Sequence, residues 1–146
     1  MRYLAAICAV LLLYANVHAQ PQVAGFIKTL EGQGHILRDA TLMPAKIGDI
    51  LHVSDTVTTA AQSSLGIMLE DDTMLSLGPE SSMEISDFAF APQNEVFSMA
   101  VRLIKGSFAY MSGVIGRVAP EKVSVETPDA VIAIHGTRFL VTVKEQ

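Results

Sequence analysis

The chain has 146 residues, of which 50% are apolar, and its fifteen acidic and ten basic side chains give a formal net charge of −5. This length suits one domain and leaves little room for a second. The Lys and Arg residues are scattered singly, whereas a nucleic-acid site needs them clustered to neutralise phosphates. Composition and charge therefore exclude a uniform phosphate-binding face, and nucleic acid is not an expected partner.

Residues 1–19 carry the three parts of a secretory signal peptide. Met1 and Arg2 form a short basic start, residues 3–14 form an apolar run, and Val17-His18-Ala19 offers a small-residue cleavage site. The apolar run is shorter than the roughly 20 residues of a membrane-spanning helix. We therefore expect cleavage between Ala19 and Gln20 and a soluble periplasmic or secreted product with no stable membrane span. An uncleaved N-terminal anchor is the alternative.

Cys8 is the only cysteine, and it lies within this leader. After cleavage, neither a disulfide nor a thiol nucleophile nor a cysteine metal site is available. Lipid attachment at Cys8 does not fit either, because too few apolar residues precede it for a lipoprotein signal. The stability of the remaining chain must come from the burial of apolar side chains.

After the leader, residues 20–24 form a short lead, and residues 25–146 form one domain of apolar runs separated by turn residues. The runs expected to form strands are 23–30, 35–38, 50–53, 55–59, 65–69, 74–77, 83–85, 88–90, 97–104, 107–111, 123–127, 130–134 and 138–143. Pro44 places residues 41–46 in a connection or on a sheet edge, because proline has no N–H to donate to a ladder. Residues 97–104 fit a helix or a strand, and their short length before Gly106 favours a strand. Two glycines make residues 113–120 a flexible turn region.

About ten short strands at a regular spacing predict an all-β domain. Two arrangements fit this pattern, a β-solenoid-like winding and a sandwich. The connections are too short for the long crossovers of a Greek-key sandwich, which favours the solenoid. No exact repeat period supports the solenoid, so the sandwich stays open.

Several turn motifs follow one another in a defined order. Gly48-Asp49 comes first, then the run from Asp55 to Thr59, then an acidic turn at Asp72 between two apolar runs, and finally residues 126–130 running into residues 135–139. In this order, from about residue 25 to residue 143, the motifs resemble the FecR domain, the periplasmic region of the iron-dicitrate transmembrane sensor and its relatives. The motif positions are Gly48, Asp49, Asp55, Thr58, Asp72, Thr127, Pro128, Gly136, Thr137 and Phe139.

The expected role of these motif residues is structural. Gly48 and Gly136 stand where a strand must reverse, and a residue without a Cβ allows a tight corner. The Thr137 hydroxyl can cap the exposed backbone of such a corner, and the carboxylates of Asp49 and Asp55 can do the same.

The resemblance implies a β-rich module related to signal transduction. FecR-type sensors couple an outer-membrane receptor to a cytoplasmic sigma factor through a cytoplasmic domain and a transmembrane helix. In place of these parts, this chain begins with a cleavable leader. We therefore expect an exported, non-enzymatic module that binds a protein partner in the cell envelope or senses a ligand. A structural component of an envelope or surface assembly is the alternative, and the oligomeric state is left open.

No pattern in the chain carries recognisable catalytic or metal-binding chemistry. His35, His52 and His135 are not spaced as zinc ligands, and no serine lies in a nucleophile elbow. The acidic run at residues 70–72 could be part of a calcium site, although it lacks the alternating oxygen ligands of a calcium loop. The methionines lie within apolar runs, which favours gap-filling in the core over copper binding. We therefore expect no catalytic residue, no metal and no cofactor.

Overall fold

The computed structural model describes residues 20–134 and 136–143. Nearly all of this chain is extended, so the prediction of an all-β domain is confirmed. The strands are β1 (Val23–Glu31), β2 (Gly34–Arg38), β3 (Thr41–Pro44), β4 (Ile50–His52), β5 (Thr56–Thr59), β6 (Ser64–Leu69), β7 (Met74–Leu77), β8 (Ser82–Ala91), β9 (Val96–Met111), β10 (Val123–Glu126), β11 (Val131–Ala133) and β12 (Arg138–Val143). The helical segments are α1 (Val114–Val118) and the 3-10 turns η1 (Pro92–Asn94) and η2 (Pro120–Lys122).

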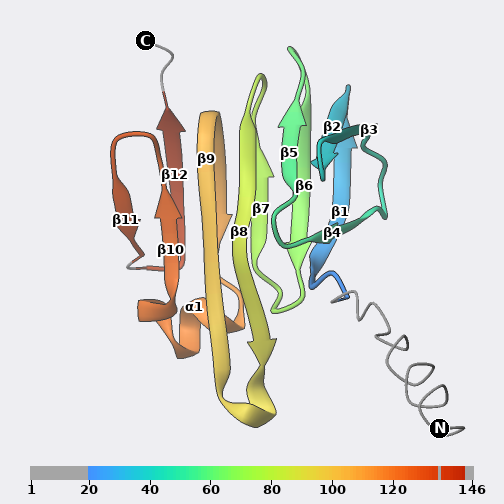
Figure 1. Ribbon diagram of the computed structural model, residues 1–146. Coiled ribbons are helices and arrows are strands. Elements are labelled where there is room, and N and C mark those ends of the chain that lie inside the picture. The colour runs from blue at the N-terminus through green and yellow to red at the C-terminus, as the bar shows by residue number, and fades with distance from the viewer. Residues whose placement is uncertain (1–19, 135, 144–146) are drawn as a thin grey trace, which may run out of the picture.

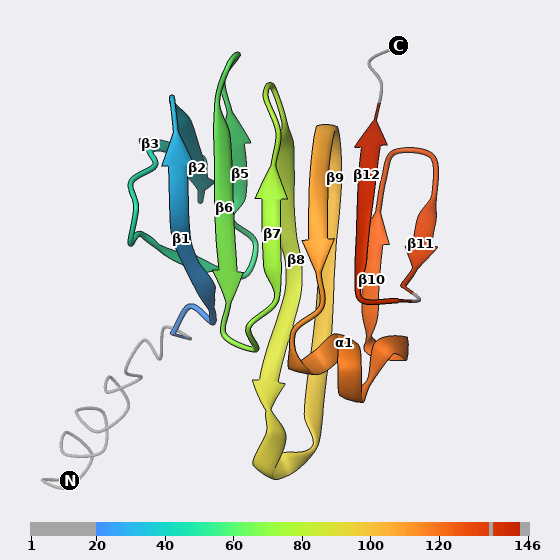
Figure 2. The same cartoon turned by 180° about the vertical axis from the view of Figure 1, so that it is seen from behind.

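The twelve strands form one sheet that curls into a half-barrel. Its main path runs β3-β2-β5-β8-β9-β7-β6-β1-β4, and β10, β11 and β12 join it through β9 or one another. The first part of β9 pairs with β8 and β10, whereas its last part pairs with β7 and β12. We call β2, β3, β5, β8, β10 and β11 the β8 half of the sheet, and β1, β4, β6, β7 and β12 the β7 half. Figures 1 and 2 show the two halves one behind the other.

Gly106 marks the place where β9 passes from one half to the other. It has a φ of +86°, and a Cβ at this position would collide with the Ser81 side chain. The buried Ser81 hydroxyl accepts the N–H of Ser107 at 2.9 Å, which fixes the strand directly after the bend. The sequence pattern predicts two strands here, separated at Gly106. That prediction is wrong, because β9 runs through Gly106 and glycine lets the strand bend without ending.

Two further expectations are corrected by the structure. The pairs along the main path are antiparallel, and β9–β10 is the one parallel pair among the described strands, so the chain is not wound as a solenoid. Strands β8 and β9, with ten and sixteen residues, are also much longer than the runs expected from the sequence at 83–85, 88–90, 97–104 and 107–111. Residues 113–120 are not a flexible turn, because Val114–Val118 forms a helical turn packed beneath the sheet (Figure 2).

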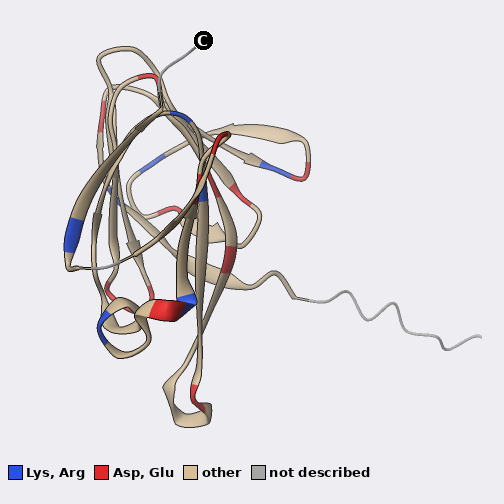
Figure 3. Ribbon diagram, turned by 90° about the vertical axis from the view of Figure 1, so that its left-hand side faces the viewer, with Lys and Arg blue, Asp and Glu red and all other residues tan. Residues whose placement is uncertain are grey.

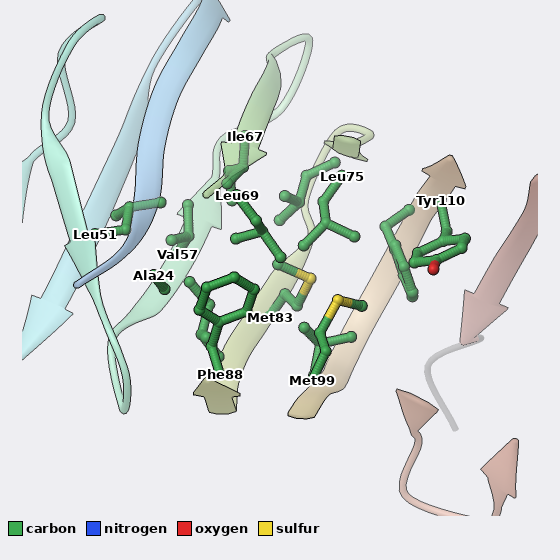
Figure 4. Close-up of a cluster of buried hydrophobic side chains, with 14 of the residues drawn as sticks. Ala24, Leu51, Val57, Ile67, Leu69, Leu75, Met83, Phe88, Met99 and Tyr110 are labelled. Carbon is green, nitrogen blue, oxygen red and sulfur yellow. The ribbon is translucent and has the colours of Figure 1, made fainter. Parts of the chain in front are cut away.

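The core lies between the two halves. Inward residues alternate with outward ones along each strand, so that Leu65, Ile67 and Leu69 of β6 are all buried. Figure 4 shows Ile67, Leu69 and Leu75 from one half meeting Met83, Phe88 and Met99 from the other. The methionines at positions 83 and 99 fill the core as expected, whereas others lie on the outer surface.

The leader at residues 1–19, with its cleavage site, lies outside the described residues, and so does His135. Among the residues that the structure describes, no helix has both the length and the apolar character needed to cross a bilayer.

Candidate functional site

Most motif residues fall at the two ends of the curled sheet, which lie on opposite sides of the molecule (Figure 1). At each end, the chain passes from an edge strand of the β8 half to an edge strand of the β7 half. Residues 45–49 join β3 to β4 at one end, and residues 134–137 join β11 to β12 at the other. We call these the β3–β4 end and the β11–β12 end.

The β3–β4 end is closed by backbone hydrogen bonds. The N–H of Ala45 donates to the Gly34 carbonyl of β2 at 2.9 Å. The N–H of Gly48 donates to the Ile27 carbonyl of β1 at 2.7 Å, and the N–H of Ile27 donates to the Asp49 carbonyl at 3.0 Å. Residues 45–49 are therefore bonded to both halves of the sheet. The φ of +94° at Gly48 favours glycine there, while the space around it is open.

An ion pair between Arg38 and Asp55 holds the same end together. The Asp55 carboxylate is almost fully buried and accepts the guanidinium of Arg38 at 2.6 and 2.9 Å. It also accepts the backbone N–H of His52 at 2.8 Å. A second N–H of Arg38 donates to the Ile50 carbonyl at 2.9 Å, which ties β2 to β4 across the two halves. The hydrogen bond to Asp55 is the main reason that the pKa of Arg38 is raised, while burial acts in the opposite direction.

Two shallow clefts flank this ion pair. The first has a volume of about 320 Å³ and is lined by Ile36, Arg38, Met43, Pro44, Lys46, Asp49 and Ile50. Asp49 is exposed there and accepts the backbone N–H of Lys46 at 2.9 Å, so its carboxylate shapes the turn as expected. The second cleft borders His52, whose Nδ1 is buried without a hydrogen-bond partner among the described residues. The second cleft is also lined by Asp39, Ser54 and Asp55, and the Asp55 carboxylate there is already bonded to Arg38 and to the His52 N–H.

The β11–β12 end contains most of the remaining motif residues. The Thr127 hydroxyl accepts the N–H of Ala130 at 3.1 Å, and Pro128 lies exposed in the same turn. Gly136 has a φ of +113°, and its carbonyl accepts the Ser112 hydroxyl at 3.2 Å. At Thr137, the backbone carbonyl makes the contact, since it accepts the N–H of Ser112 at 2.8 Å. Among the described residues, no hydrogen bond from the Thr137 hydroxyl is found.

Phe139 packs at the border of the core beside this end. Its ring is half-buried and stacks on Tyr110, with centroids 4.6 Å apart, and it meets Phe108 edge-on at 6.2 Å. Burial is the main cause that raises the pKa of Tyr110, and the nearby Asp71 adds to it, while the hydrogen bond with Ser112 lowers it. The ring cluster anchors β12 on β9.

The edges at this end are exposed. Among the described strands, β12 pairs with β9 alone and β11 pairs with β10 alone. Leu140 on β12 and Val131 on β11 are each 71% exposed, the largest values among the exposed large apolar side chains. No hydrogen bond between β11 and β12 is found in the part of the chain that the structure describes.

Two motif residues lie away from both ends. Asp72 is exposed in the turn between β6 and β7 with a φ of +68°, and its N–H donates to the Leu69 carbonyl at 3.0 Å. Thr58 lies in the middle of β5, opposite His35 and Ser82. The motif positions therefore form no single site, and what joins most of them is their location at turns and strand ends.

Asp71 is a key residue that the sequence pattern did not single out. Its carboxylate is buried and accepts the N–H groups of Thr73 and Ile115 at 3.2 and 3.0 Å and the Thr73 hydroxyl at 2.8 Å. The Asp-x-Thr spacing indicates the local bonds to Thr73, but nothing indicates the bond to Ile115. Because Asp71 is buried and Asp72 exposed, the acidic turn does not converge as a calcium site does. Among the described residues, no three His, Cys, Asp or Glu side chains form a group that could hold a metal.

Fold and site together define the class of protein. It is an all-β domain whose buried carboxylates hold backbone corners, and the basic residues are dispersed over several elements (Figure 3). A family model described as FecR protein matches residues 55–146, from the buried Asp55 onward. The chain therefore belongs to the FecR protein family, which relates it to signal transduction. Neither the comparison with curated proteins nor the comparison with solved structures gives a match.

Proposed function

We propose that this protein is an exported, non-enzymatic signalling module that binds a protein partner in the cell envelope by adding a partner strand to β12. Membership of the FecR family supports the signalling part of this proposal. The leader at residues 1–19 supports export to the periplasm or beyond. The pairing of β12 on one side only is the observation that carries the binding mode.

The four edge strands differ in how well they could accept a partner strand. β3 has four residues and ends in Pro44, which has no N–H, and β4 and β11 have three residues each. Short edges and proline are common protections against strand addition. β12 has six residues without proline, and each is in register with a residue of β9. It is therefore the edge best suited to β-strand addition.

The side chains of β12 would help to select the added strand. Phe139 and Val143 are half-buried at the border of the core, so an added strand with apolar residues at every second position would cover them. The main-chain groups on the free side of β12 would supply the hydrogen bonds. No cofactor or metal is needed for this mode of binding.

Site-specific photocrosslinking in cells tests the proposal. A photoreactive residue at Thr142, exposed on β12, is compared with one at Leu42, exposed on the β3 edge. We expect Thr142 to crosslink to an outer-membrane receptor or an inner-membrane sensor, and Leu42 not to. Equal crosslinking from both positions, or none from Thr142, would contradict binding at β12. Crosslinks only to this chain or to a surface assembly would favour the structural alternative instead.

A further inference from the structure

A row of apolar side chains crosses the outer surface of the β7 half. The strand registers align Ile50 with Phe26, Phe26 with Met68, Met68 with Met74, Met74 with Met111, and Met111 with Arg138. These six residues belong to β4, β1, β6, β7, β9 and β12 in that order. We call Ile50, Phe26, Met68, Met74 and Met111 the apolar row, with Arg138 at its β12 end.

The apolar row is not part of the core. Its members alternate with fully buried neighbours, so that Leu51, Leu75 and Tyr110 point inward next to Ile50, Met74 and Met111. Ile50 is 49% exposed, Phe26 37% and Met111 42%, and Met68 and Met74 are partly exposed. The fold therefore leaves five adjacent large side chains on its surface, although single exposed apolar residues are the more usual pattern.

The outer surface of the β8 half is different. There the equivalent register aligns Thr56, Glu84, Arg102 and Glu126 across four strands. Arg102 forms ion pairs with Glu126 at 3.1 Å and with Glu84 at 3.8 Å. A polar outer face is what a water-facing antiparallel sheet normally has. The apolar row departs from that pattern across five strands, whereas in this register of the β8 half the exposed apolar residues lie outside the four central strands, at Leu42, Leu37 and Val131.

A shallow groove lies beside the β12 end of the apolar row, where β7, β9 and β12 meet. The next outward position on each central strand is small, with Gly66 on β6, Ser76 on β7 and Ala109 on β9 in register. A cleft of about 180 Å³ opens here, lined by Met74, Ser76, Ala109, Tyr110, Met111 and Arg138. The methionines form one wall of the groove, and small residues form its floor. Six neighbouring strands are about 24 Å across, which matches a helix of about 16 residues.

Charge distinguishes among the possible occupants. Arg138 lies at one end of the row and Lys28, exposed two residues after Phe26 on β1, lies near the other. Neither side chain has a hydrogen-bond or ion-pair partner among the described residues. An occupant with acidic groups at both ends would pair with them. A second copy of this face would instead bring cation against cation or against apolar side chains. The exposed Glu70 and Asp72, next to Met68 and Met74, would together with the net charge of −5 oppose an anionic membrane.

We propose that the apolar row is a docking face for an amphipathic helix of a partner protein, with acidic residues at the two ends of the helix's apolar stripe. Methionine side chains adapt to different apolar surfaces, which suits them to holding a helix. The helix lies across the strands in the groove, as in other helix-in-groove complexes. This face shares Arg138 with β12 but uses outward side chains and not the free main-chain edge, so it does not depend on strand addition there.

Two synthetic helical peptides of 18 residues serve as probes, on the order of the length that spans the row. Both carry the same leucine stripe, and one has glutamates at its two ends where the other has lysines. Binding to the full chain, produced with a C-terminal tag, is measured by fluorescence anisotropy. We expect the glutamate peptide to bind at least about ten-fold more tightly than the lysine peptide, a difference of about 1.4 kcal/mol.

Matched variants locate the binding. The double variant Met74→Ser with Met111→Ser should weaken glutamate-peptide binding at least about ten-fold, since it removes the wall of the groove. Ile104→Ser is the control, because Ile104 lies on the same strand as Met111 and is 44% exposed on the outer surface of the other half. Its affinity should match that of the unmodified chain. Arg138→Glu should remove most of the difference between the two peptides, because Lys28 remains at the other end, and circular dichroism verifies that each variant is folded.

Several results would overturn the proposal. Equal binding of the two peptides, no binding of either, or equal losses in the Ile104 control and the methionine variant would each do so. Binding only to vesicles of phosphatidylglycerol would assign the face to a membrane. Self-association that the methionine variant abolishes, measured by analytical ultracentrifugation without peptide, would assign it to a second copy.

Discussion

The two ends of the curled sheet differ in how the connection between the two halves is held. At the β3–β4 end, residues 45–49 make backbone hydrogen bonds to β1 and β2, and Arg38 reaches from β2 to Asp55 and to the Ile50 carbonyl. At the β11–β12 end, the described contacts of the connection run to Ser112 alone, and both edge strands stay exposed. The polar groups of the β3–β4 end hold the fold together, whereas at the β11–β12 end β12 pairs on one side only. In our proposal, stability and binding therefore belong to opposite sides of one sheet.

The largest loss of stability is expected from breaking the ion pair between Arg38 and Asp55 at the β3–β4 end. Asp55→Ala leaves the Arg38 guanidinium and the His52 N–H without their buried acceptor. Because removing one member of a buried ion pair leaves the other uncompensated, we expect a loss of about 3 kcal/mol in the free energy of unfolding. Urea unfolding followed by circular dichroism measures it. The exposed Asp49→Ala is the control and should cost less than about 1 kcal/mol; similar losses in both variants would contradict the account.

A somewhat smaller loss of stability is expected at the attachment of α1, near the β11–β12 end. Asp71→Ala removes the acceptor of the Thr73 and Ile115 N–H groups, and leaving these unpaired should cost about 2 kcal/mol. The neighbouring Asp72→Asn, on an exposed residue whose φ asparagine tolerates, should change stability by less than about 0.5 kcal/mol. Thermal unfolding of the two variants compares the loss of a buried carboxylate with the loss of an exposed one in the same turn. An Asp71 variant as stable as the Asp72 variant would refute the anchoring of α1.

The aromatic contact that fixes β12 should contribute less to the free energy of unfolding than either of these carboxylates. Phe139→Leu keeps an apolar side chain but loses the stack on Tyr110, so we expect a cost of about 1 kcal/mol. Leu140→Ala, one residue further along the strand, changes an exposed side chain and should cost under about 0.5 kcal/mol. Urea unfolding compares the two. A larger cost at Leu140 would mean that β12 does not present that side chain to solvent.

The smallest effect concerns pH. Burial raises the pKa of Tyr110 above its ordinary value of 10.0, so the folded protein holds this proton more tightly than the unfolded chain does. The stabilisation from Tyr110 is therefore complete below pH 10 and is lost as the pH rises through the folded-state pKa. Between about pH 9 and pH 11, Tyr110→Phe should lose less unfolding free energy than the unmodified chain. Parallel stability curves would show that the phenol is not buried.

Alternation along each strand made the core largely predictable from the sequence. Leu65, Ile67 and Leu69 follow a period of two, and this local rule holds regardless of which strands pair. The pairing itself was not predictable, because a period of two is common to solenoids, sandwiches and half-barrels. The joining of β3 and β4 by residues 45–49 depends on bonds to Ile27 and Gly34, which nothing in the local sequence specifies.

Glycine was the least reliable signal. At Gly48 it indicated a tight corner, and the structure has a turn there with a positive φ. At Gly106 the same residue type bends a long strand without ending it. At Gly113 glycine reflects close packing, since a Cβ there would collide with the backbone of residues 71–73 and prevent α1 from docking. A glycine in the sequence therefore does not show whether it is needed for its φ, for a bend or for space.

The motif residues were expected to be structural, and their placement explains why no site emerged from them. Asp55 and Thr127 act on backbone groups at opposite ends of the sheet. The surfaces from which we infer binding, the free edge of β12 and the apolar row, depend on strand order and register. Because those are tertiary features, only the structure could bring Phe26, Met74 and Met111 into one line.

Amide hydrogen exchange on the partner complex tests the central claim most directly. The complex would be recovered from envelope extracts with the tagged full chain and compared with the chain alone. If a partner strand adds to β12, the amides within Arg138–Val143 that point away from β9 should exchange more slowly in the complex, while those of the β3 and β4 edges stay unchanged. Unchanged exchange along β12, or protection at β3 and β4 instead, would contradict the assignment of binding to the β11–β12 end.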